Sequence, residues 1–282
     1  MKRSVVALGL LGLVCAVALP AANAAVLLKD DFSTDALLKS KATYVQGFGS
    51  AIRSDATVIP WYVRDGYLTS NPPDGGTTGS DGTGANNDLT TLDPLPVDFV
   101  LLTGDPKWAD VALQINMRSD GQNTGHFSLI LRATPKTKPT DPDTRYEFAY
   151  STANSAEGAG NATKECITPQ MDASGIDPPD DVPNLRILKV VGGKYKLLAE
   201  TNFDTSKTYI PEVNAAGPEN DGGANFRAVA KGNVLQFWIG LPGKPYSKYL
   251  EVTDDELKAG LVGLTHAEYN PNFDDLLVED AP

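Results

Sequence analysis

The chain has 282 residues, of which 41% are hydrophobic and 21% charged, and its formal net charge at pH 7 is −12. So acidic a protein does not attract nucleic acid or an anionic membrane surface, and neither is expected as a partner. The length allows one large hydrophobic core without disulfide staples, so we expect a single domain.

Residues 1–24 have the pattern of a secretory signal peptide. Lys2 and Arg3 precede an apolar run over residues 5–19, and an Ala-Asn-Ala tripeptide at 22–24 fits a cleavage site. The apolar run is short for a membrane span, and no later run of about 18 apolar residues follows it. We therefore predict a secreted or periplasmic protein that does not insert into a membrane once the leader is removed.

The predicted mature chain, residues 25–282, is more acidic and holds one cysteine. Removal of the leader takes away Lys2 and Arg3 and no acidic residue, so the formal charge changes from −12 to −14. Cys166 is then the only cysteine, which excludes an intramolecular disulfide and leaves the role of this thiol open.

The first part of the mature chain predicts short strands beside a long loop. Residues 26–32 form the first expected strand, and residues 61–68 form the next signal, with a turn at Asp65-Gly66. Residues 69–96 are rich in Gly, Asp, Asn, Pro and Thr and are expected to be a loop. Their acidic residues lack the spacing of a helix-loop-helix calcium site.

Three segments between residues 108 and 150 then alternate apolar and polar residues, as half-buried strands do. Their apolar faces consist of Val111, Leu113, Ile115 and Met117, then Phe127, Leu129 and Leu131, then Tyr146, Phe148 and Tyr150. Residues 151–183 and 202–225 are polar and are expected to be loops.

Residues 185–200 predict a β-hairpin closed by a Gly-Gly dipeptide, because both loop positions can take a positive φ. The implied register pairs Leu188 with Leu197 on one face and Lys189 with Lys196 on the other. Like charges directly opposite each other are unfavourable unless water screens them, so we expect the lysine face to be exposed.

The last part of the chain predicts a second hairpin over residues 226–241, turning at Lys231-Gly232-Asn233. Residues 254–259 are expected to form a helical turn, and residues 260–264 and 273–279 to form the closing strands.

Many short alternating strands without a repeat of 34 or 40 residues predict an all-β fold, a two-layer antiparallel β-sandwich. The residues expected in its core are Leu113, Ile115, Leu129, Leu131, Phe148, Leu188, Leu197, Leu235 and Phe237.

The order of these signals resembles the concanavalin A-like lectin/glucanase (laminin G-like) jelly roll, and within it the bacterial secreted 3-keto-disaccharide hydrolase-like domains. The motifs that carry the resemblance are Asp30-Asp31-Phe32, Trp61 with Asp65-Gly66, Trp108-Ala109-Asp110-Val111, Arg132, Tyr146 to Phe148, the hairpin at 185–200, Arg227 with Lys231-Gly232-Asn233, Gly260 with Gly263-Leu264, and residues 273–278. The resemblance implies a single sandwich over residues 25–282 whose first and last strands lie side by side. This fold hosts lectins, hydrolases, lyases and inert spacers, so it does not fix the function.

Catalytic residues are not identifiable from the sequence. The Glu-x-Asp-x-x-Glu pattern by which glucanases of this fold supply two carboxylates is absent, and residues 251–256 come nearest to it. His126 and His266 do not have the spacing of a metal-binding pair. Whether the protein is an enzyme stays open; a glycoside hydrolase is the alternative.

Polar residues on the outward faces of the predicted strands are candidates for ligand binding. They are Asn116, Arg118, Arg132, Glu147, Gln236 and Trp238. If these strands are neighbours, they present donors, acceptors and one indole ring, which suit the hydroxyl groups and the C–H face of a sugar. The alternative is that a loop covers Trp238 and that the polar residues are merely solvated.

Two acidic pairs, Asp30-Asp31 and Asp274-Asp275, are candidates for a structural Ca²⁺ site. The resemblance implies that their strands are adjacent, and four nearby carboxylates repel one another unless a cation or a basic group intervenes. The alternative is that one aspartate of each pair faces water and the other caps a loop.

The function that the sequence favours most is the binding of carbohydrate or of a cell-surface polymer by a secreted protein. An extracellular structural or assembly subunit is a second alternative beside the glycoside hydrolase. The ligand and the oligomeric state are not defined by the sequence.

Overall fold

The computed structural model describes residues 24–35, 44–48, 61–69, 99–119, 125–135, 142–152, 169–177, 183–203, 210, 213, 223–267 and 271–282. Cys166, residues 1–23 of the predicted leader, and most residues of the predicted loops at 69–96, 151–183 and 202–225 lie outside these residues. Among the described residues, no helix has the length and apolarity needed to cross a bilayer.

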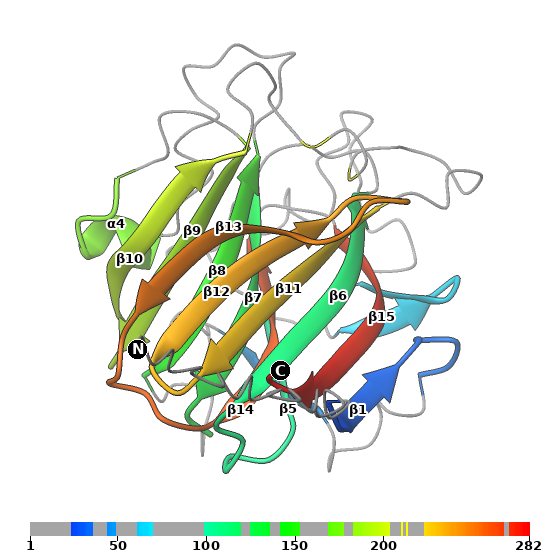
Figure 1. Ribbon diagram of the computed structural model, residues 1–282, viewed down its shortest axis with the longest axis horizontal. Coiled ribbons are helices and arrows are strands. Elements are labelled where there is room, and N and C mark those ends of the chain that lie inside the picture. Colours follow the sequence, from blue (N-terminus) through cyan, green and yellow to red (C-terminus); the bar gives the residue numbers. More distant parts are fainter. Residues whose placement is uncertain are drawn as a thin grey trace, which may run out of the picture.

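Two antiparallel sheets form a sandwich, with sheet A in front of sheet B in Figure 1. The strands of sheet A are β1 (Val26–Asp30), β3 (Tyr62–Arg64), β4 (Tyr67–Thr69), β6 (Val111–Ser119), β11 (Ala224–Lys231), β12 (Val234–Gly240), β13 (Ser247–Thr253) and β15 (Pro271–Asp280). The strands of sheet B are β2 (Tyr44–Phe48), β5 (Phe99–Thr103), β7 (Gly125–Ala133), β8 (Arg145–Thr152), β9 (Asn184–Val191), β10 (Lys194–Asn202) and β14 (Leu261–Ala267).

Sheet A has the strand order β13-β12-β11-β6-β15-β4-β3, and β1 pairs with β15 beside this path. Sheet B has the order β10-β9-β8-β7-β14-β5-β2. The described residues contain one short helix, α4 (Pro169–Ala173). The predicted two-layer antiparallel sandwich is confirmed, and so is the predicted pairing of the first strand with the last.

Alternation along the strands places one face of each sheet in the core between them. Of the nine residues predicted to be buried, all except Leu197 are buried, and Leu197 is half-buried. Leu188 is buried on the opposite face of sheet B, where it joins a smaller cluster with Met171 and Ile176 from the α4 segment. Sheet B is therefore covered on both faces where this cluster lies.

The hairpin of β9 and β10 turns at Gly192 and Gly193, whose φ angles are 59° and 78°. Lys189 pairs with Lys196 as predicted, but a bulge after Leu197 shifts the register toward the strand end. The expectation that the lysine face is exposed is wrong, because Lys189 is 7% exposed and lies on the core side of sheet B.

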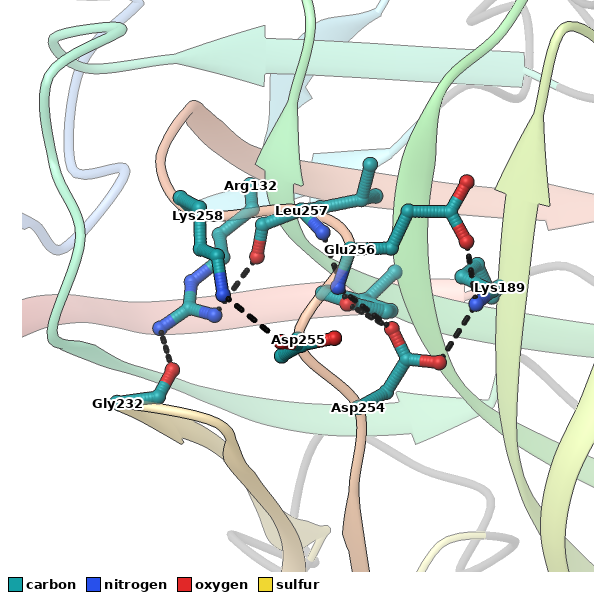
Figure 2. A network of polar contacts seen from close by, with 9 residues as sticks. Arg132, Lys189, Gly232, Asp254, Asp255, Glu256, Leu257 and Lys258 are labelled. Carbon is teal, nitrogen blue, oxygen red and sulfur yellow. Dashed lines mark hydrogen bonds and ion pairs between the residues drawn. The ribbon is translucent and has the colours of Figure 1, made fainter.

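Lys189 is accepted in the interior because acidic groups from the segment after β13 neutralise it (Figure 2). Its Nζ donates to Asp254 Oδ2 at 2.6 Å and to Glu256 Oε2 at 2.7 Å. The hydroxyl of Tyr146 donates to Asp254 Oδ1 at 2.5 Å and accepts from the backbone N–H of Leu257 at 3.1 Å. These bonds raise the pKa of Lys189 and lower that of Asp254, although burial opposes both shifts and is the largest single influence on each.

The predicted helical turn over residues 254–259 is wrong, because this segment is not helical. Side chains of sheet B hold it instead, and Asp254 is a partner of Lys189 and Tyr146 rather than a helix-capping acid. The segment leads from sheet A to sheet B, so these contacts fasten the two sheets to each other.

Arg132 makes a second connection between the sheets (Figure 2). Its guanidinium donates to the carbonyl oxygens of Leu257 and Gly232, each at 2.8 Å. It also donates to the carbonyl oxygen of Ala109 at 3.0 Å. Gly232 lies in the turn between β11 and β12, so an arginine of sheet B holds a turn of sheet A. The φ of Arg132 is 53°, a conformation unfavourable for a side chain of this size, and the three bonds offset its cost.

Leucine-to-alanine substitutions should lower the free energy of unfolding by different amounts on the two faces of sheet B. Leu129→Ala should lower the free energy of unfolding by about 2–5 kcal/mol, because Leu129 is fully buried between the sheets. Leu197→Ala should cost less than about 1.5 kcal/mol, because Leu197 is only half-buried. Urea denaturation of both variants checks this, and equal losses would contradict the assigned burial.

Removal of the Asp254 carboxylate should be costly, because it leaves a nearly buried ammonium and a tyrosine hydroxyl without their partner. We expect Asp254→Ala to lower the free energy of unfolding by about 3 kcal/mol. The matched control is Lys258→Ala, which breaks an exposed ion pair with Asp255 and should cost less than about 0.5 kcal/mol. Similar values for the two variants in denaturant melts would argue against the inter-sheet network.

Candidate ligand-binding face

The six predicted binding residues do not lie on one surface. Asn116 and Arg118 of β6 and Gln236 and Trp238 of β12 belong to sheet A, whereas Arg132 and Glu147 belong to sheet B. The condition for a common surface, that these strands are neighbours, is not met, because strands with the same alternation pattern lie in two different sheets. Whether any of the six binds a ligand stays a prediction.

The polar side chains on the outer face of sheet A largely bond to one another. Asn116 Nδ2 donates to Asn225 Oδ1 at 3.3 Å, and the guanidinium of Arg118 lies 3.6 Å from the centre of the Tyr67 ring.

On β12 of the same face, Trp238 Nε1 donates to Gln236 Oε1 at 3.2 Å, and Gln236 Nε2 donates to Glu251 Oε2 at 2.8 Å. Trp238 is half-buried, and the ammonium of Lys248 lies 5.7 Å from its ring centre. These groups already have protein partners, so few of them need a hydrogen bond from a ligand.

The outer face of sheet B is different, because polar side chains surround one small residue there. Ala149 of β8 pairs with Ser128 of β7 and with Arg186 of β9. Side chains two residues apart on a strand share a face, and pairing extends that face across the sheet. The polar residues thus placed around Ala149, here called the Ala149 ring, are His126, Ser128, Glu147, Ser151, Asn184 and Arg186.

All six members of the Ala149 ring are buried, with exposed fractions of 0–3%. Several of their polar atoms nevertheless have no hydrogen-bond partner among the described residues. These atoms are both imidazole nitrogens of His126, Ser128 Oγ, Glu147 Oε2, Asn184 Oδ1 and Arg186 Nη1. The hydroxyl oxygen of Thr265, which pairs with Ser128 from the neighbouring strand, also has no described partner. A buried polar atom without a partner costs about 1–3 kcal/mol, so such a cluster calls for water or a ligand.

Two carboxylates of the Ala149 ring and its surroundings, those of Glu147 and Glu200, are each ion-paired with an arginine through one of their oxygens. Arg145 Nε and Nη2 each lie 2.6 Å from Glu147 Oε1, and the hydroxyl of Tyr195 donates to the same oxygen at 3.2 Å. Arg186 Nε and Nη2 donate to Glu200 Oε1 at 2.9 and 2.7 Å. These bonds fix Glu147 and Arg186 and leave Glu147 Oε2 and Arg186 Nη1 for other partners.

His126 is neutral at physiological pH. Burial lowers the pKa of its imidazole to about 4, and the positive charges of Arg186 and Arg145 act in the same direction. A neutral imidazole carries one donor nitrogen and one acceptor nitrogen, so His126 offers both.

The members of the Ala149 ring that the sequence did not indicate as binding residues are Ser128, Ser151, Asn184 and Arg186, and His126 was considered only as a metal ligand. The alternation of β7 places His126 and Ser128 on one face, which was available from the sequence. The sequence does not show that β7, β8 and β9 pair side by side. That pairing is what places polar residues around Ala149.

The acidic pairs are explained by local backbone geometry rather than by a metal. Asp30 Oδ1 accepts from the N–H of Phe32 at 2.9 Å, where φ is 48°. Asp274 Oδ1 accepts from the N–H of Asp275 at 2.7 Å, where φ is 50°, at a register shift in β15. Aspartate tolerates and supports such left-handed positions.

These carboxylates do not fit the predicted Ca²⁺ site. Asp31 Oδ1 accepts from the N–H of Ser33 at 3.1 Å, so three of the four acids are used in turns of their own segments. Burial raises the pKa of Asp274, and the charges of Asp275 and Asp31 add to this effect. The described residues contain no group of three or more His, Cys, Asp or Glu side chains that could hold a metal ion.

Comparison with known proteins gives similarity of fold only. No family model and no curated protein matches the chain. A galectin-like protein of unknown function from Bacillus subtilis is 12% identical, with 91% of this chain and 96% of that chain covered and a TM-score of 0.49. The carbohydrate-binding module CBM66 from Bacillus subtilis is 14% identical, with 65% and 83% covered and a TM-score of 0.40.

The legume lectin-like domain from Entamoeba histolytica is 10% identical, with 85% of this chain and 91% of that chain covered and a TM-score of 0.43. All three are lectin-like or carbohydrate-binding folds, the group that the sequence resembles. At such scores they carry no argument about function, and the sandwich rests on the strand pairing itself.

The titration of His126 should be visible in the stability of the protein. Its imidazole takes up a proton less readily in the folded state, with a pKa of about 4, than in the unfolded state, with a pKa of about 6.5. The full contribution of neutral His126 is therefore present above about pH 6.5, and it is lost progressively as the pH falls toward about 4. Over this window, the stability of the protein relative to His126→Gln should fall by about 3 kcal/mol.

Urea melts of both proteins between these pH values measure this difference, since carboxylate titrations common to both cancel. Parallel pH profiles for the two proteins would mean that His126 is not held neutral in the fold.

Proposed function

We propose that the protein binds carbohydrate at the Ala149 ring on the outer face of sheet B. The observation that carries the proposal is the set of buried polar atoms there that have no partner among the described residues. A secreted or periplasmic location, which the leader-like residues 1–24 support, would bring this face into contact with extracellular glycans.

The chemistry of the ring suits hydroxyl groups. Glu147 Oε2 and Asn184 Oδ1 can only accept hydrogen bonds, Arg186 Nη1 can only donate, and the imidazole and the serine hydroxyl can do both. A sugar hydroxyl donates one bond and accepts others, so neighbouring hydroxyls on one sugar ring can serve all of these groups. Ala149 itself lies in the apolar cluster of Met171, Ile176 and Leu188, so the polar groups around it, and not Ala149, would contact the sugar.

Binding is favoured over hydrolysis because both carboxylates near the ring are ion-paired with arginine. A glycosidase needs one carboxyl group that holds a proton and a second at a defined distance from it. Oε1 of Glu147 and Oε1 of Glu200 each accept hydrogen bonds from an arginine, so neither oxygen is available to carry that proton.

The proposal predicts that a larger side chain at the centre of the ring blocks binding. On a glycan array, Ala149→Leu should lose the signals that the unmodified mature protein gives. Ser128→Ala should weaken binding about 3- to 10-fold, as expected for one lost hydrogen bond. It should not lower the free energy of unfolding, because Ser128 Oγ has no described protein partner to lose.

Trp238→Ala on the outer face of sheet A is the matched control and should leave glycan binding unchanged. If Trp238→Ala abolishes binding while Ala149→Leu does not, the sugar lies on sheet A and the proposal is wrong. Thermal melts of all three variants show whether a lost signal reflects unfolding.

A further inference from the structure

The Ala149 ring is closed in this conformation, so a ligand can reach it only if the segments that cover it move. His126, Ser128 and Glu147 are each at most 1% exposed, and Ala149 is 2% exposed. Among the described residues, the segment packed over Ala149 is α4 with the residues that follow it, 169–177, here called the α4 cover. Figure 1 shows α4 beside β10, at one end of sheet B.

The α4 cover is attached to sheet B by a small apolar cluster. Among residues 171–177 only Met171 and Ile176 are buried. Their partners are apolar side chains of β8, β9 and β10, namely Ala149, Leu188, Val190 and Tyr195. All six residues form a cluster that is separate from the main core between the sheets. A small satellite cluster of this kind can come apart while the main core stays packed.

The contacts of the α4 cover lead directly to the polar groups of the ring. The backbone N–H of Tyr195 donates to Ser174 Oγ at 3.0 Å, and the Tyr195 hydroxyl donates to Glu147 Oε1 at 3.2 Å. Leu188, another partner of the cover, pairs with Glu147 across β8 and β9 and shares its face of the sheet. Displacement of the α4 cover therefore uncovers the side of the ring where Glu147 lies.

Opening has opposite effects on the apolar and the polar groups under the α4 cover. Exposure of Met171 and Ile176 to water is unfavourable. Exposure of Glu147 Oε2 is favourable, because this buried oxygen has no hydrogen-bond partner among the described residues and water would supply one. The closed conformation is therefore held less firmly than its apolar contacts alone would hold it.

We propose that the α4 cover opens locally, while the two sheets stay folded, and that this opening admits the ligand to the Ala149 ring. The inference rests on the proposed function and adds a step to it. The ligand binds the open conformation, so its apparent affinity is reduced in proportion to the fraction of molecules that are open. Substitutions that weaken the α4 cover should then strengthen binding.

Labelling of a cysteine placed under the α4 cover tests the opening without a ligand. The probe is Ala149→Cys in the mature protein with Cys166→Ser, labelled by an aromatic disulfide reagent in up to about 2 M urea. If opening is local, the labelling rate should hardly depend on urea, because little surface becomes exposed. Met171→Ala should raise this rate at least about 10-fold, because the cover loses one of its two buried side chains.

The matched control is Ala228→Cys in the same background, because Ala228 is fully buried in the main core. Its labelling requires global unfolding, so its rate should be at least about 100-fold lower and should rise steeply with urea. Equal rates with the same urea dependence at both cysteines would overturn the inference. Ile176→Ala serves in place of Met171→Ala if that variant does not fold.

Binding measurements test whether the opening admits the ligand. For a glycan that the array identifies, Met171→Ala should lower the dissociation constant at least about 3-fold and speed association, because more molecules are open. Asp172→Asn, on an exposed residue of the same helix, is the control and should change neither quantity. Weaker binding by Met171→Ala would overturn the inference. If no glycan binds, the proposed function fails, and the labelling rates still decide whether the α4 cover opens.

Discussion

The contact between Lys189 and Asp254 determines which way β9 faces, and the candidate site depends on that choice. Side chains alternate along a strand, so a lysine directed into the core places Leu188 and Arg186 on the opposite face. With Lys189 on the outside, Arg186 would lie between the sheets and the Ala149 ring would lose its guanidinium. An ion pair at one end of the sandwich thereby fixes the chemistry of a face that it does not touch.

The same dependence explains what could be predicted from the sequence. Strands such as β6 and β12 have clear alternation, and their faces were predicted correctly because burial alone decides them. The facing of β9 was predicted wrongly because the two lysines of the hairpin were weighed only against each other. The partner of Lys189 lies 65 residues away, in a segment expected to be a helical turn, so both errors have one cause.

The pairing between strands was the other feature that could not be predicted from the sequence. Alternation assigns Asn116, Arg132 and Gln236 to outward faces, but it does not say to which sheet each strand belongs. The structure places Arg132 at a register shift, with a φ of 53°, where it bonds three carbonyl oxygens between the sheets. No periodicity in the sequence indicates such a position, because a bulge breaks the periodicity on which the prediction rests.

The two outer faces also differ in how their polar groups are satisfied. On sheet A, Trp238 and Gln236 bond to each other and face solvent in part, so water can replace any contact that is lost. On sheet B, seven buried atoms without described partners would together cost an amount comparable to the entire net stability of a domain, about 5–15 kcal/mol. A folded protein does not sustain that cost by itself. The proposed sugar, or ordered water in its absence, would satisfy these groups and so offset that cost.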